Sequence, residues 1–159
     1  MSQTDDLLYL ETDGGCANCG LRDNRALTIH HLEQLTPKNE DYDNKLILCH
    51  NCHQCHHQNK GPSAEELKKI KRRLIIKTLT RIGLNALKRA YRRPVVVAMP
   101  FLVEHLIESG YLEHRKDSTI WVEDDNADPT ISGPDHVIVD AEYAITSAGR
   151  TLLEKWNLK

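Results

Sequence analysis

The chain has 159 residues, which suits one domain of ordinary size or two small ones, and its 40% hydrophobic content supports a packed core. It contains no stretch approaching the roughly 20 apolar residues of a membrane span, and its polar, acidic start lacks the apolar core of a signal peptide. The sequence therefore predicts a cytoplasmic protein with no membrane partner. In that compartment cysteines favour metal ligation over disulfides.

The net charge of −2 conceals three segments of different charge. Residues 1–59 carry four basic and nine acidic side chains, a net of −5, whereas residues 60–93 carry twelve and two, a net of +10. Residues 94–148 carry two and eleven, a net of −9. With the motifs below, these shifts predict an α+β protein of three parts: a Cys/His-rich domain at 1–60, a basic helical segment at 61–93 and a further domain at 94–159, which could begin near residue 79.

The first part contains the signals of two strands and a helix. Short apolar runs at 26–29 and 45–48 predict two strands joined by the turn-rich loop 36–44. A short helix is expected from about residue 51 to residue 59.

Four of the five cysteines form two Cys-x-x-Cys pairs, Cys16/Cys19 and Cys49/Cys52. Four thiolates satisfy tetrahedral zinc completely, so we expect a closed, structural zinc site. The pairs are 29 residues apart, against roughly 15–20 in simple zinc ribbons, so the insert can hold a two-stranded unit. Four free buried cysteines are the alternative, and the two correctly spaced pairs count against it.

The histidines predict a second, open metal site. His53 and His57 are four residues apart, so on a helix they project from one face and can share a metal. His30 and His31 are adjacent at the end of a predicted strand and point to opposite sides, so one can bind the metal while the other faces a substrate. Three imidazole ligands suit a first-row metal and leave positions open for water and a phosphate oxygen. His56 could replace His57 if the helix register differs.

The order His31, Asn44, His53 resembles the motif of HNH endonucleases, whose nuclease domain has a ββα-metal arrangement, and the cysteine pairs resemble the zinc-stabilised four-cysteine subgroup. The match covers a little over a quarter of the chain. The resemblance implies that His31 is the general base, that Asn44 holds the geometry that orients it, and that His30, His53 and His57 hold one catalytic divalent metal (Mg²⁺, Mn²⁺, Ni²⁺ or Zn²⁺).

The basic segment predicts nucleic-acid contact, because affinity for polyanions comes largely from neutralising phosphates. Ser63 and Glu66 form a capping-box pattern at its start, and Thr78, Thr80 and Gly83 predict a break in the helix. A solvated helix face is the alternative, and the acidic tail could also neutralise this helix. The residues expected to contact phosphates are Lys68, Lys69, Lys71, Arg72, Arg73 and Lys77.

The last part reads as a helix at 101–110, strands at 111–114 and 119–123 separated by a turn, a third strand at 137–139 and a closing helix at 145–156. A polar loop is expected at 124–134. The sequence around the helices is similar to that of winged-helix domains. A DNA-reading wing is normally basic, whereas this part is acidic, which favours a homodimer or protein partner about as much as DNA.

The resemblance implies a metal-dependent HNH endonuclease that hydrolyses phosphodiester bonds in DNA, with double-stranded DNA as the expected partner. Two alternatives stay open. One is a zinc-stabilised DNA-binding regulator that has lost catalysis, and the other is a nuclease subunit that a partner activates.

Overall fold

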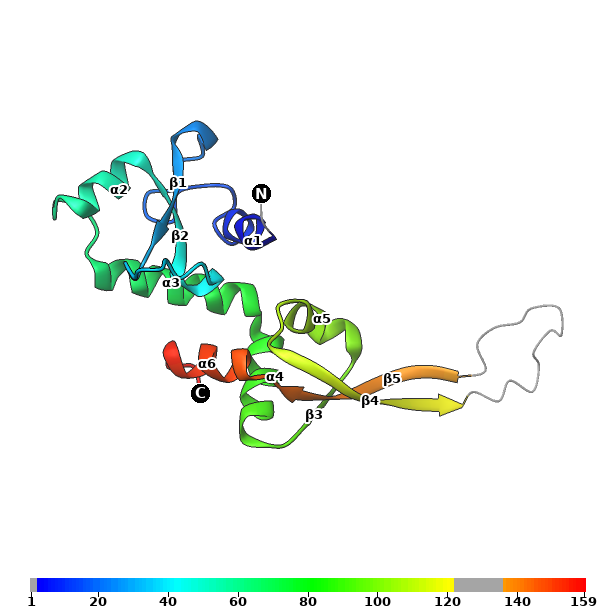
Figure 1. Ribbon diagram of the computed structural model, residues 1–159. Coiled ribbons are helices and arrows are strands. Elements are labelled where there is room, and N and C mark those ends of the chain that lie inside the picture. Colours follow the sequence, from blue (N-terminus) through cyan, green and yellow to red (C-terminus); the bar gives the residue numbers. More distant parts are fainter. Residues whose placement is uncertain (1–2, 122–135) are drawn as a thin grey trace, which may run out of the picture. The chain divides into compact units, whose positions relative to one another are not determined.

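The computed structural model describes residues 3–121 and 136–159 (Figure 1). In that part the chain forms six α-helices and two antiparallel sheets, of two and three strands, which confirms the expected α+β class. None of the described helices is both long enough and apolar enough to cross a membrane. The chain divides into two compact units, Met1–Thr78 and Leu79–Lys159, and each is described by itself.

The first unit is built around an antiparallel strand pair that leads into a helix, a ββα order. The predicted strands are confirmed, and the first of them extends through both adjacent histidines, so that His30 lies opposite Leu46 and His31 opposite Lys45. Its elements are α1 (Gln3–Glu11), η1 (Asn24–Ala26), β1 (Leu27–His31), η2 (Tyr42–Asn44), β2 (Lys45–Cys49), α2 (His50–His57) and α3 (Ala64–Leu79).

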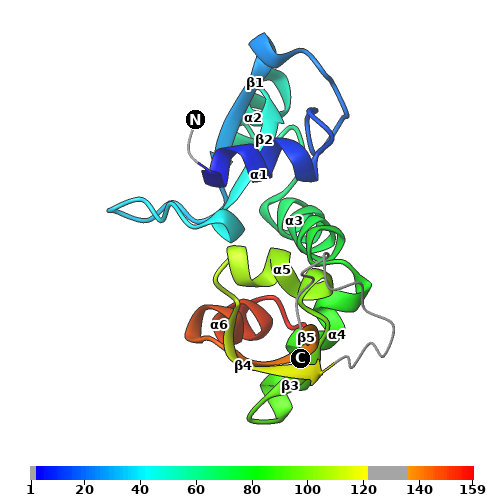
Figure 2. The same ribbon diagram turned by 90° about the vertical axis from the view of Figure 1, so that its right-hand side faces the viewer.

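Two flanking helices complete the core of this unit. Leu8 of α1 and Leu67 of α3 are fully buried in one cluster with Leu46, Ile47 and Leu48 of β2. Helix α1, which the sequence patterns did not reveal, crosses the strand pair in Figure 2. Because every residue of β2 is buried, this strand lies in the interior and fixes the start of α2.

The basic segment folds as two helices. The predicted capping box is confirmed, since the backbone N–H of Glu66 donates to Ser63 Oγ at 3.3 Å and the N–H of Ser63 donates to a Glu66 carboxylate oxygen at 2.8 Å. The predicted break is also confirmed. Helix α3 ends at Leu79, and Thr80, with a φ of +58°, caps the next helix.

A buried ionic cluster joins α1, η2 and α3. Lys71 and Glu11 are both fully buried side chains, and the Lys71 ammonium lies 2.8 Å from a Glu11 carboxylate oxygen and 3.7 Å from the centre of the Tyr42 ring. The Tyr42 hydroxyl donates to the other Glu11 oxygen. Burial lowers the pKa of Lys71 to about 8 and raises that of Glu11, and each partner's charge opposes the shift of the other.

The expectation that Lys71 contacts phosphate is therefore wrong. Its side chain is inside the protein and is neutralised by Glu11, so it holds helices together rather than facing an anion. The helical spacing of the basic residues did not reveal this, because the buried partner comes from a helix sixty residues away.

Replacing Lys71 with methionine is expected to destabilise the first unit by about 3–5 kcal/mol, because an unpaired carboxylate would remain buried. The double variant Glu11→Gln/Lys71→Met removes that charge while keeping an acceptor for Tyr42, so it should be more stable than Lys71→Met alone. Urea denaturation of both variants and of Glu11→Gln measures the free energies of unfolding. Equal destabilisation of the single and double variants would contradict the argument.

The second unit consists of α4 (Arg81–Arg92), β3 (Val96–Ala98), α5 (Pro100–Glu108), β4 (Leu112–Trp121), β5 (His136–Ile145) and α6 (Ser147–Lys155). Its sheet has the order β3-β5-β4. The expected turn at 115–118 is wrong, because β4 runs through these residues as one strand paired with β5. The strand register shifts twice within this polar stretch. The expected loop at 124–134 lies outside the described residues.

Candidate functional site

The four paired cysteines converge at the base of the ββα unit. The sulfurs of Cys16, Cys19, Cys49 and Cys52 all lie within 4.8 Å of one another, and those of Cys19 and Cys49 are 3.7 Å apart. Four sulfurs held about 2.3 Å from one zinc ion in a tetrahedron would be about 3.8 Å apart. The cluster therefore fits a closed, structural zinc site with no position left for a substrate.

Hydrogen bonds and burial change the pKa values of the thiols in this cluster. The Asn18 side chain donates to Cys52 Sγ at 3.4 Å. Burial would raise the pKa of Cys16, but backbone hydrogen bonds from Cys19, Cys49 and Asn18 bring it down to about 7. Burial raises the pKa of Cys52 to about 12. Four neighbouring thiols in this setting do not all ionise at neutral pH by themselves, and a bound divalent cation would supply the compensating charge.

A second cluster lies between β1 and α2. Donor nitrogens of His30, His53 and His57 are within 4.8 Å of one another, and the Nε2 atoms of His53 and His57 are 3.3 Å apart. Two nitrogens bound about 2.0–2.1 Å from one ion in a tetrahedron would be about 3.3–3.4 Å apart. The structure thus brings together the three histidines that the sequence selected.

His30 is the buried member of this cluster. Its side chain is 3% exposed, and its Nδ1 has no hydrogen-bond partner among the described residues. Burial first, and then the neighbouring histidines, of which His56 contributes most, lower the pKa of His30 to about 4. The ring is neutral at pH 7, which is the form that binds metals. A buried unsatisfied nitrogen beside two other imidazoles fits a metal site better than a packing role.

His56 makes different contacts from His57. Its Nδ1 bonds the carbonyl oxygen of Pro62 at 2.7 Å, and its ring packs edge-on against His30 with centroids 4.9 Å apart. His56 therefore fixes the turn between α2 and α3 and covers the buried ring. The group of three donors contains His57, which is exposed at the end of α2.

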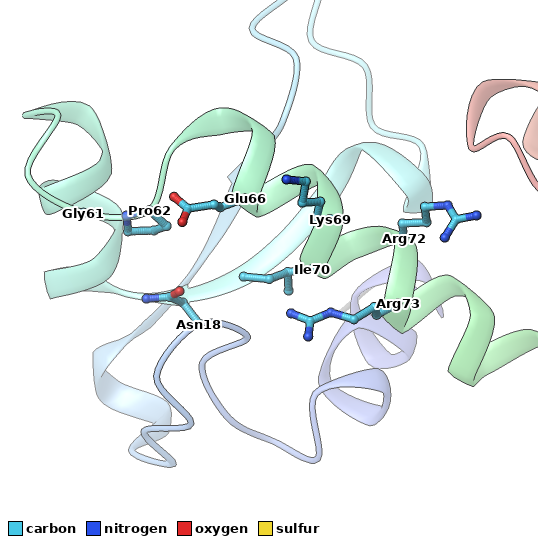
Figure 3. Close-up of a pocket in the computed structure, with 8 residues that line it drawn as sticks. All are labelled: Asn18, Gly61, Pro62, Glu66, Lys69, Ile70, Arg72 and Arg73. Carbon is cyan, nitrogen blue, oxygen red and sulfur yellow. The ribbon is translucent and has the colours of Figure 1, made fainter.

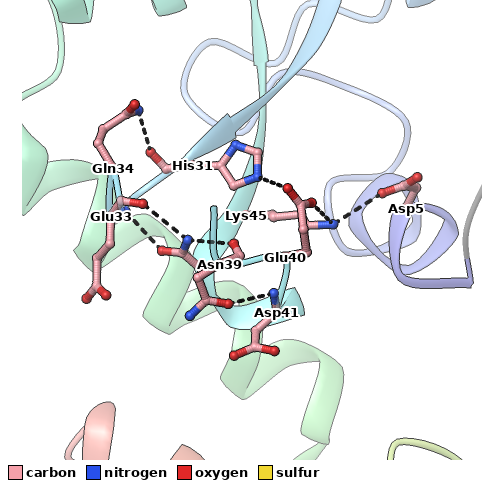
Figure 4. A network of polar contacts seen from close by, with 9 residues as sticks. Asp5, His31, Glu33, Gln34, Asn39, Glu40, Asp41 and Lys45 are labelled. Atoms are coloured by element: carbon pink, nitrogen blue, oxygen red, sulfur yellow. Dashed lines mark hydrogen bonds and ion pairs between the residues drawn. The ribbon is translucent and has the colours of Figure 1, made fainter. Parts of the chain in front are cut away.

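His31 lies at the centre of a polar network (Figure 4). Its Nε2 is 3.1 Å from Oε1 of Glu40, whose other oxygen lies 2.9 Å from the Lys45 ammonium. Hydrogen bonds from Lys45 and His31 lower the pKa of Glu40, which keeps it ionised. A carboxylate accepts hydrogen bonds, so in the neutral imidazole of His31 the proton is on Nε2 and Nδ1 is the acceptor. Asp5 of α1 also pairs with Lys45, with a carboxylate oxygen 3.7 Å from the Lys45 ammonium.

Sequence reasoning missed Glu40 and Lys45. The patterns place Glu40 in a loop and Lys45 in an apolar strand, and neither placement suggests a role in the site. The available signal was the strand pairing, because the register that places His31 opposite Lys45 puts an ammonium beside the histidine. Glu40 could not be found in this way, since it comes from a loop whose path depends on tertiary contacts.

Asn44 organises that loop. It is fully buried, its Oδ1 accepts from the N–H of Glu33 at 2.9 Å, and its Nδ2 donates to the carbonyl of Asn39 at 2.9 Å. Its own carbonyl accepts from the N–H of Leu32 at 2.8 Å. These bonds join the residues that follow His31 to the start of β2. Asn44 thereby sets the shape of the chain segment that delivers Glu40 to His31.

The remaining basic residues of α3 divide into two groups. Lys77 bonds Asp13 and the carbonyl of Glu11 on the α1 side, which ties α3 to α1. The other group consists of exposed side chains that an anion can reach, namely Lys68, Lys69, Arg72 and Arg73.

Comparisons with protein-family models, with curated proteins and with solved structures give no match to this chain. The chemistry of the site therefore rests on its own residues.

Proposed function

We propose that this chain is a metal-dependent endonuclease of the HNH type that hydrolyses phosphodiester bonds in DNA. The observation that carries the proposal is the convergence of His30, His53 and His57 on a ββα framework, next to a His31 held by a carboxylate. A structural histidine cluster would not need a buried ring nitrogen without a partner.

His31 is the proposed general base. With Nε2 bonded to Glu40, its Nδ1 can take a proton from an attacking water, and the Glu40 carboxylate stabilises the imidazolium that forms. Lys45 and Asp5 hold Glu40 and act as positioning residues. A divalent cation bound by His30, His53 and His57 would supply Lewis acidity toward the phosphate and its leaving oxygen.

The zinc cluster is proposed to keep this site in shape. Cys49 ends β2 and caps α2, its sulfur accepting from the N–H of Cys52 at 3.4 Å, so the second cysteine pair is also the strand–helix junction. Helix α2 carries His53 and His57 directly after that junction. A zinc ion at the cysteines would thus fix the angle at which both histidines leave the sheet.

The second unit is proposed to be winged-helix-like and to bind a protein partner or a second copy of this chain. Its sheet order β3-β5-β4 and the β4–β5 hairpin support a winged arrangement. However, α5 is followed directly by β4, and apolar side chains are exposed at Val97, Met99 and Phe101. Both features favour docking over the reading of DNA bases.

Plasmid nicking tests the proposed function. Purified protein with its zinc retained is incubated with Mg²⁺, Mn²⁺, Ni²⁺ or Zn²⁺, and we expect cleavage with at least one of them. His53→Ala removes one donor nitrogen and should lower cleavage by about 10²-fold or more. His50→Ala changes an exposed histidine of the same helix that lies outside the donor group, and should leave cleavage unchanged. No cleavage with any metal would favour the regulator or the partner-activated subunit.

A further inference from the structure

A pocket of about 800 Å³ lies between α3 and the segment that contains the first cysteine pair, and Figure 3 labels the residues that line it. Asn18 forms one wall, and Ile70 and Arg73 extend toward it from α3. Gly61 and Pro62, in the turn between α2 and α3, form one end. The pocket is tied to the histidine cluster, because the carbonyl of Pro62 is the hydrogen-bond partner of His56.

The charge of this pocket is positive. Lys69, Arg72 and Arg73 all line it, and Glu66 is the one acidic residue among those that line it. The Glu66 carboxylate accepts from both the N–H and the hydroxyl of Ser63 at 2.8 Å, so it is engaged in the cap of α3. Lys69 and Arg73, beside a carboxylate already engaged in a helix cap, give the pocket the charge of a site for an anion.

The pocket also offers surfaces that a phosphate alone does not require. Ile70 and Pro62 are apolar and half-buried, and together they provide a wall against which a flat ring can lie. The amide of Asn18 is oriented by its bond to Cys52 Sγ, which leaves its oxygen to accept a hydrogen bond from a ligand. Guanidinium planes such as that of Arg73 are common stacking partners for unpaired bases.

We propose that this pocket binds an unpaired nucleotide of the nucleic-acid substrate, so that the preferred substrate is a duplex continued by a single-stranded segment. A duplex presents its phosphates on a convex surface and hides its base faces, so it can use the cations but not the apolar wall. An unpaired nucleotide presents a phosphate, a flat ring and base-edge donors together. The volume is also in the range of small-ligand pockets. This inference rests on nucleic acid being the substrate, as proposed above.

Fluorescence anisotropy tests the inference with two labelled probes, a blunt duplex and the same duplex extended by a single-stranded tail. Measurements use the full chain with His31→Ala, which slows cleavage of the probes. We expect the tailed probe to bind about tenfold more tightly than the blunt one. Lys69→Ala/Arg73→Ala should remove this preference. The matched control Lys60→Ala/Lys68→Ala also removes two exposed charges, but from residues that do not line the pocket, and should weaken both probes equally.

A charge-neutral variant separates the pocket from general electrostatics. Asn18→Ala should weaken only the tailed probe, with zinc content measured to show that the cysteine cluster is retained. Equal affinity of the two probes for the parent protein, or equal effects of the two double variants, would overturn the inference. Plasmid nicking distinguishes the two proposals. If the protein nicks plasmid but shows no tail preference, the inference alone fails; if it shows tail preference but nicks with no metal, the proposed catalysis alone fails.

Discussion

Replacing Cys49 with serine is expected to unfold the first unit and to leave the second unit folded. Binding energy at a structural zinc site is folding energy, about 10–16 kcal/mol for zinc-finger peptides, which is comparable to the whole stability of about 5–15 kcal/mol of an ordinary domain. Cys49 is the most sensitive position because it is buried, ends β2 and caps α2. Hydrogen–deuterium exchange, read separately over residues 3–78 and 79–159, measures the effect.

Cys55→Ser is the matched control for this experiment. Cys55 lies in the same helix, but its sulfur is outside the four-sulfur cluster and is 3.7 Å from the Asn51 side chain. This variant should keep the zinc content and the exchange protection of the parent protein. Removal of zinc with a chelator should reproduce the Cys49→Ser result. Native-like protection of β2 in Cys49→Ser would show that the cysteines are ordinary core residues.

The sequence was most informative where the relevant spacing is local. The two Cys-x-x-Cys pairs and the i, i+4 histidines on one helix follow from the geometry of short segments, and the structure brings these side chains together. The cap of α3 is equally local, and Ser63 and Glu66 make the bonds that their spacing predicts. Within one cysteine pair, one histidine pair or the cap, neighbouring residues determine the geometry, whereas the contact between Cys19 and Cys49 depends on the tertiary fold.

The sequence was least informative where a side chain's role depends on a distant partner. Lys71 belongs to the same run of basic residues as Lys68. It is buried because its ammonium pairs with the Glu11 carboxylate of α1. Glu40 reaches His31 because Asn44 shapes the loop between them. Such pairings need the folded chain, since helical or strand periodicity contains no information about which segment packs opposite.

The same limit explains the second sheet. The polar stretch at 115–118 has the composition of a turn, and local preference would end a strand there. Pairing with β5 over ten residues overrides that preference. The register irregularities after His114 and Ser118 accommodate the mismatch without breaking the strand. Pairing with β5 therefore makes residues 115–118 part of a strand, although their composition alone predicts a turn.

Replacing His31 with alanine should lower the rate of phosphodiester cleavage by about 10²–10⁴-fold while leaving metal binding and folding intact. His31 lies outside the group of three donor nitrogens, so its loss removes the proton acceptor and not the cation site. Single-turnover cleavage at saturating protein separates the chemical step from DNA binding. Calorimetric titration with the metal that supports cleavage measures the cation site directly.

Glu40→Gln gives a graded version of the same test. Glutamine can still accept a hydrogen bond from Nε2 of His31, but it cannot stabilise the imidazolium with a negative charge. The substitution also removes the ion pair between residue 40 and Lys45. We expect cleavage to fall by about 10–100-fold through kcat, with KM for DNA nearly constant. Glu33→Gln, which changes a half-buried carboxylate that points away from the His31 ring in Figure 4, is the control and should cleave normally. If Glu40→Gln and Glu33→Gln cleave at equal rates, the carboxylate does not assist the base.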